Sequence, residues 1–110
     1  MKNPTEDNSS EIIVIEIIDL EEYALADKHP HPHAKKFRIK IDNKKYEVDV
    51  PCMTGSEILS LAGKNPKDCQ LREKIHGKMV TIEPNEEVDF RKHGIERFTT
   101  LCSGVTDGGR

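Results

Sequence analysis

The residues with the clearest chemical potential are two adjacent glycines, Gly108 and Gly109, which are followed by Arg110. Glycine has no Cβ, so an enzyme can close around an extended Gly-Gly backbone, and no side chain hinders attack at the Gly109 carbonyl. The surrounding stretch, TLCSGVTDGGR, is too polar to bury apolar surface. The segment is therefore either a solvated terminus without a function or the part of the chain on which acyl-transfer enzymes act. The type of domain that precedes it decides between these two interpretations.

Other reactive side chains lack the partners that catalysis or metal binding requires. The cysteines Cys52, Cys69 and Cys102 show no metal-ligand spacing and no neighbouring histidine motif, so we expect free thiols in a reducing cytoplasm. In His29–His33 prolines separate the three imidazoles, and no carboxylate or cysteine completes a ligand set. The sequence therefore predicts a protein that is not an enzyme, with no catalytic residues, no metal site and no cofactor.

Composition limits the kinds of partner. The 110 residues suffice for one domain, and the net charge of −3 with scattered lysines gives no attraction for nucleic acid or anionic membranes. The first ten residues form no apolar signal segment. The longest apolar run, Ile12–Ile18, contains Glu16 and is far shorter than the roughly 20 residues of a membrane span. We therefore expect a cytoplasmic protein that binds neither nucleic acid nor membranes.

An aliphatic strand is predicted ahead of the domain. It is apolar on both faces, so it must be covered, either by its own domain or by a sheet edge of another copy or of a partner protein. A contact between copies that does not close would build a filament. Asp19 and Glu22 then predict the start of a short helix, Leu20–Lys28. The candidate partner-binding residues are Ile12, Ile13, Val14, Ile15, Ile17 and Ile18.

The domain itself opens with a hairpin and a helix. Phe37–Ile41 and Tyr46–Val50 alternate between apolar and polar residues across a short polar turn, which predicts a β-hairpin. Thr54 and Glu57 have the spacing of a capping box, so a helix of about two turns should begin after Thr54. Gly63 follows as its stop signal.

Three further strands are predicted over Gln70–Ile75, Met79–Ile82 and Ile95–Leu101. A helix on one face of a mixed sheet is a two-layer α+β architecture, and the order of elements fits a β-grasp. In that arrangement the last strand runs parallel to the first, at the centre of the sheet. The terminal segment would then leave directly from a rigid central strand.

Three stretches resemble one known family. KFRIKIDNKKYEVD, TGSEILSLAGKNP and EPNEEVDFRKHGIERFTTL, within residues 36–101, are similar to the multiubiquitin-domain family of bacterial ubiquitin-like proteins. The resemblance implies a ubiquitin (β-grasp) fold and a role as a protein modifier. It also implies three enzyme partners: an activating enzyme, a conjugating-type enzyme and a zinc-dependent JAB-type peptidase. This chain carries one copy of the pattern rather than tandem copies, and residues 1–35 lie outside it.

The resemblance gives the glycine pair a specific role. Activation would adenylate the Gly109 carboxylate and pass the acyl group to an enzyme nucleophile, before an isopeptide bond joins it to an unknown target protein. While Arg110 is attached, that carboxylate is an amide. The JAB-type peptidase is therefore expected to cut between Gly109 and Arg110, using a zinc ion of its own.

Two alternatives stay open. One is a β-grasp sulfur carrier, although such carriers usually end at the second glycine and lack a long arm. The other is an interaction module that is not conjugated and that assembles through its N-terminal strand. In each case we expect an arm and linker at residues 1–35, a ubiquitin-like domain at 36–102 and a tail at 103–110.

Overall fold

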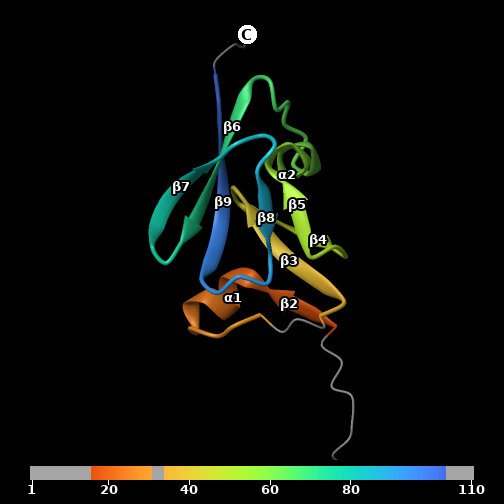
Figure 1. Cartoon of the computed structure of the whole chain (residues 1–110), viewed down its shortest axis with the longest axis vertical. Helices are drawn as coiled ribbons and strands as arrows, with labels where there is room; N and C mark the ends of the chain where they lie inside the picture. Colours follow the sequence, from red (N-terminus) through yellow and green to blue (C-terminus); the bar gives the residue numbers. More distant parts are fainter. Residues whose placement is uncertain (1–15, 31–33, 104–110) are drawn as a thin grey trace, which may run out of the picture.

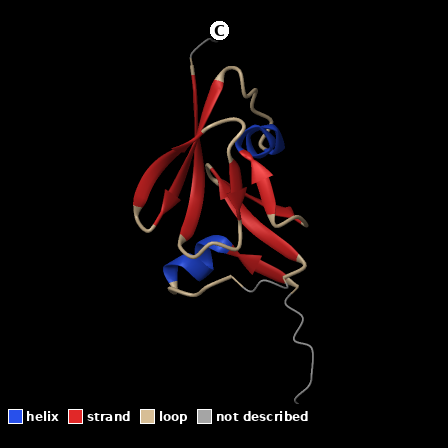
Figure 2. Ribbon diagram, viewed as in Figure 1, coloured by secondary structure: helices blue, strands red, loops and turns tan. Residues whose placement is uncertain are grey.

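A mixed six-stranded sheet forms the body of the computed structural model, which describes residues 16–30 and 34–103 (Figure 1). A separate two-stranded sheet and two short helices complete this part of the chain (Figure 2). The architecture is the predicted α+β class. In chain order the elements are β2 (Ile17–Asp19), α1 (Leu20–Leu25), β3 (Lys36–Ile41), β4 (Lys44–Val48), β5 (Cys52–Thr54), α2 (Gly55–Leu61), β6 (Cys69–Ile75), β7 (Lys78–Ile82), β8 (Glu87–Asp89) and β9 (Ile95–Cys102).

The β3–β4 hairpin is confirmed, with a shifted second strand. The strands pair antiparallel from Phe37–Val48 to Ile41–Lys44. Thus β4 begins and ends two residues before the predicted Tyr46–Val50. The turn is tight because Asp42 adopts a left-handed conformation with φ of 57°.

Helix α2 begins as its capping box predicts. The Thr54 hydroxyl accepts the backbone N–H of Glu57 (3.2 Å), and the Glu57 carboxylate accepts the backbone N–H of Thr54 (2.8 Å). Gly63, with φ of 75°, follows the C-cap at Ala62. Two three-residue strands, β5 and β8, pair with each other. The sequence did not predict them, because three residues are too few to show an alternation of apolar and polar side chains.

The last strand occupies the predicted central position. β9 lies between β3 and β6, parallel to β3 at Ile41–Phe98 and antiparallel to β6 along most of its length. β7 pairs with the far side of β6. Both expectations for β9, its place in the sheet and its direction relative to the first hairpin strand, are confirmed.

The arm enters the same sheet. Phe37 pairs with Val48 of β4 on one side and with Ile18 of β2 on the other, so β2 and β9 share one edge of β3, at opposite ends. Helix α1 follows β2 and packs against β9 and β3 (Figure 1). The helix ends at Leu25 rather than at the predicted Lys28, because Asp27 has a left-handed φ of 57°.

One hydrophobic core joins all of these elements. Ile18 (0% exposed) and Leu20 from the arm are buried in it with residues of the domain. The described part of the arm therefore contributes to folding rather than serving as a detached linker. The core consists of Ile18, Leu20, Phe37, Ile39, Ile41, Ile58, Leu59, Leu71, Ile82, Val88, Phe90, Ile95 and Phe98.

Candidate functional site

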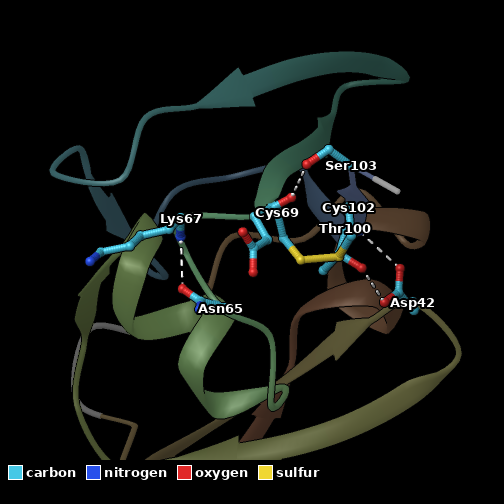
Figure 3. Close-up of a disulfide and its surroundings, with 8 residues drawn as sticks. Asp42, Asn65, Lys67, Cys69, Thr100, Cys102 and Ser103 are labelled. Carbon is cyan, nitrogen blue, oxygen red and sulfur yellow. Dashed lines mark hydrogen bonds between the residues drawn. A yellow bond between two sulfur atoms is a disulfide. The ribbon is translucent and has the colours of Figure 1, made fainter. Parts of the chain in front are cut away.

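The end of β9 is where the chain leaves the sheet toward the glycine pair, and Asp42 of the β3–β4 turn holds this strand. The Asp42 backbone N–H donates to the carbonyl of Phe98 (2.9 Å). The Asp42 carboxylate accepts the Thr100 backbone N–H (2.9 Å) and the Thr100 hydroxyl (2.7 Å; Figure 3). These bonds join residues 58 positions apart, so they fix β9 to β3 up to Thr100.

Two residues farther along, a disulfide joins Cys102 to Cys69 of β6 (Figure 3). The expectation of free thiols is therefore wrong for these two cysteines. They are the last residue of β9 and the first residue of β6, which face each other across an antiparallel pair. Their separation of 33 positions in the sequence concealed this proximity, and only the strand register reveals it.

Ser103, the last described residue, has its own attachment. Its backbone N–H and its hydroxyl both donate to the carbonyl of Asp68 (2.8 and 3.1 Å). Leu101 is 56% exposed and borders an open depression of about 550 Å³ beside the disulfide. The end of the strand is thus held by polar and covalent contacts, with little apolar burial.

The predicted conjugation and processing residues follow this point. Gly108, Gly109 and Arg110 lie outside the described residues, so their roles stay predictions. The structure does place the end of β9 at the opposite end of the molecule from β2 and α1 (Figure 1).

Of the predicted partner-binding residues, the structure describes two. Ile17 and Ile18 belong to β2 and pair with Lys36 and Phe37 of the same chain. Ile12, Ile13, Val14 and Ile15 lie outside the described residues. For the described part, docking on its own domain is the arrangement observed.

Asp19 anchors this docked arm. Its side chain, 6% exposed, accepts the backbone N–H of Glu22 and so caps α1 as predicted. The same carboxylate lies 2.6 Å from Lys45 Nζ and 3.8 Å from Arg38 of the hairpin. The hydrogen bond to Asp19 raises the pKa of Lys45 above its usual value. One carboxylate therefore starts the helix and joins the arm to the hairpin.

Cys52 is the one described cysteine with a free thiol. Burial, followed by the negative charges of Asp89 and Glu87, raises the pKa of Cys52 above its usual value. Arg91 lies 3.8 Å from the sulfur, but Asp89 engages its guanidinium through two hydrogen bonds of 2.8 Å. A thiol that resists ionisation in this way is a poor nucleophile.

Three histidines gather where the arm meets the domain, an arrangement that the sequence did not predict. The His29 and His93 rings stack with centroids 4.1 Å apart, and the His76 ring meets His93 edge-on at 5.2 Å. Asp27 Oδ1 lies 2.7 Å from His93 Nε2, but without the alignment of a hydrogen bond. Within residues 16–30 and 34–103, no three ligand side chains converge on a common point that could hold a metal ion.

Glu73 of β6 is a second feature that the sequence did not reveal. It stands opposite Phe98 of β9 and is only 5% exposed. Burial raises the pKa of Glu73, Lys92 opposes the shift, and Glu86 reinforces it. Because desolvation is the largest cause, this carboxylate weakens the fold when it is ionised.

A mixed sheet with few helices, packed in two layers, is consistent with a ubiquitin-like domain. The chain belongs to the Multiubiquitin family, whose model matches residues 37–102. No curated protein and no solved structure is similar enough to the chain to give a match. The family match is consistent with a protein that is not an enzyme. In the described part of the chain, neither helix has the length and hydrophobicity that would let it cross a membrane.

Proposed function

We propose that this protein is a ubiquitin-like modifier of a bacterial conjugation system, joined to its targets through the Gly109 carboxylate. The observation that carries the proposal is the family match over residues 37–102, which ends where β9 ends. The β3–β4 hairpin, the following α2 and a central β9 parallel to β3 support assignment of the fold as a β-grasp. The glycine pair follows that central strand within a few residues.

The chemistry begins with hydrolysis. A JAB-type peptidase would add water across the Gly109–Arg110 peptide bond, which creates the Gly109 carboxylate and releases the amino group of Arg110. An activating enzyme would adenylate that carboxylate. The acyl group would then pass to an enzyme cysteine and finally to an amino group of the target, with a conjugating-type enzyme as carrier.

The test is to express the full chain together with an activating enzyme, a conjugating-type enzyme and a JAB-type peptidase from the same organism. Intact mass spectrometry should show loss of Arg110, followed by adducts in which Gly109 is attached to another protein. Gly109→Ala and deletion of Gly108 and Gly109 should abolish the adducts. Gly104→Ala is the matched control, because it changes a glycine of the same segment outside the pair and should leave adduct formation intact.

The alternatives predict different masses. A sulfur carrier would exchange one oxygen of the Gly109 carboxylate for sulfur and form no protein adduct. A module that is not conjugated would keep its activity after deletion of residues 108–110. If the enzymes ignore the chain both with Arg110 and without it, the modifier proposal is wrong.

We further propose that Ile12, Ile13, Val14 and Ile15 form the strand that contacts another copy or a partner protein. The support is their aliphatic character on both faces of a strand. Sedimentation velocity of the full chain over a wide concentration range tests this. A variant with Ile13→Lys and Ile15→Lys should lose any assembly that the unmodified chain shows.

A further inference from the structure

The disulfide lies at the end of β9, the last described strand before the glycine pair in the sequence. Cys69 begins β6 and Cys102 ends β9, so the bond closes the β6–β9 ladder at its end. Ser103 adds two hydrogen bonds to the carbonyl of Asp68, the residue before Cys69. Both attachments therefore depend on β6 and β9 staying in register at this end.

The next attachment inward is at Thr100. Its backbone N–H and hydroxyl are held by Asp42, and Phe98, two residues earlier, is fully buried. Leu101, Cys102 and Ser103 are all exposed. Opening these three residues therefore loses little hydrophobic burial, whereas opening the strand beyond Thr100 breaks the Asp42 bonds and exposes the core.

We propose that the Cys69–Cys102 disulfide is a redox site that sets whether Leu101–Ser103 stay attached to the sheet, ahead of the glycine pair on which the enzymes of conjugation would act. The inference rests on the proposed function. A dithiol reductant would attack the disulfide and form a mixed disulfide, and its second thiol would then resolve that intermediate. Two protein thiols and one oxidised, disulfide form of the reductant result, so two electrons and two protons pass to the protein.

Reduction changes the last residue that the described attachments hold. With the disulfide intact they hold the chain up to Ser103, which stands six residues before Gly109 in the sequence. With the disulfide reduced and the end of the strand open they hold it only up to Thr100, nine residues before Gly109. The maximum distance from Thr100 to Gly109 stays the same, because the end of β9 is already extended, but three more residues become able to turn when an enzyme binds the glycine pair.

The bond is accessible to such chemistry. The open depression beside it is lined by Lys67, Gln70, Leu101 and Ser103, and Cys102 itself is exposed. Cys52, by contrast, lies on β5, outside the β6–β9 ladder that the disulfide closes. Burial also raises the pKa of its thiol, so it is a poor reactant for disulfide exchange. Cys52→Ser is therefore a matched control for cysteine loss.

The first experiment needs no enzyme. Hydrogen–deuterium exchange of the full chain is compared in its oxidised form and after reduction with dithiothreitol, and intact mass confirms each state. We expect exchange of the Leu101–Ser103 segment to rise at least about tenfold on reduction, while Ile95–Phe98 stays protected. The Cys52→Ser variant should respond like the unmodified chain, and a Cys69→Ser/Cys102→Ser double variant should exchange fast under both conditions.

Chymotrypsin gives a second readout, because cleavage after Leu101 requires the strand to open. Cleavage should be fast in the reduced chain and in the double variant, and slow in the oxidised chain. Equal exchange in both states, failure of the oxidised chain to form the disulfide, or loss of protection across all of β9 would each overturn the inference.

A final experiment separates this inference from the proposed function. Removal of Arg110 by the peptidase is timed on oxidised and reduced chain. A faster reaction on the reduced form supports redox control of the strand end. Equal rates, or a faster reaction on the oxidised form, overturn it and leave the modifier role standing, whereas no removal from either form counts against the modifier role itself.

Discussion

The position of the arm in the core leads to one prediction. It tests whether the arm that packs against a domain belongs to the same chain or is exchanged with another copy. Ile18 is fully buried and pairs with Phe37 in the β2–β3 register. Ile18→Ala removes three carbon atoms from the core, about 2.4 kcal/mol by transfer alone at roughly 0.8 kcal/mol for each buried methylene. The cavity left behind raises the expected loss of unfolding free energy to about 3–4 kcal/mol.

The assay is urea unfolding of the full chain, followed by circular dichroism, at protein concentrations that differ a hundredfold. Thermal unfolding of the same samples gives a second readout, in which a loss of this size should lower the midpoint by more than about 10 °C in a domain of this size. Leu25→Ala in α1 is the matched control, because Leu25 is 71% exposed and should change stability by less than about 0.5 kcal/mol.

Two outcomes would refute this reasoning. A change of less than about 1 kcal/mol for Ile18→Ala would mean that the arm is not packed in the core. An unfolding midpoint that rises with protein concentration would mean that the buried arm comes from another copy, because association makes stability depend on concentration.

Three further changes follow from the local structure. Thr54→Ala removes one half of the α2 capping box and should lower the free energy of unfolding by about 1 kcal/mol, measured by urea unfolding. Gly94→Ala should destabilise the fold, as a lowered thermal midpoint, because φ at Gly94 is 93° and a Cβ there would lie 2.4 Å from the His76 ring. Glu73→Gln should stabilise the protein at pH 7. The raised pKa of Glu73 means that the folded state holds its proton more tightly, so the unmodified protein loses stability as pH rises through that pKa, and the advantage of glutamine should shrink toward acidic pH. Glu83→Gln, at an exposed position, should show no such pH-dependent gain.

Much of the fold was predictable because its signals are local. Thr54 and Glu57 are three residues apart and bond only to each other's backbone, so their capping box depends on nothing distant. The alternation in Phe37–Ile41 likewise requires only that one face of a strand be buried. Asp19 capped a helix as its sequence context predicts, although the helix ended early at a left-handed Asp27.

Contacts between side chains of different strands were not predictable in the same way. The single sequence contains Cys69 and Cys102, Asp42 and Thr100 without any sign that they meet, because each pair depends on the register of strands distant in the chain. The free thiols expected at Cys69 and Cys102 were wrong for this reason. The residue type gives the chemistry of each group, but only the register gives its partner.

The sequence alone determined the helix caps, the alternating strands, the family pattern and the presence of a Cβ-free Gly108–Gly109 pair, since each is a property of neighbouring residues. Tertiary structure decided that Ile18 completes the core of its own chain, that Asp42 holds β9, and that a disulfide closes the last strand just before the chain continues toward Gly109. The physical reason is that burial and cross-strand bonding are long-range, so they exist only once the sheet has assembled.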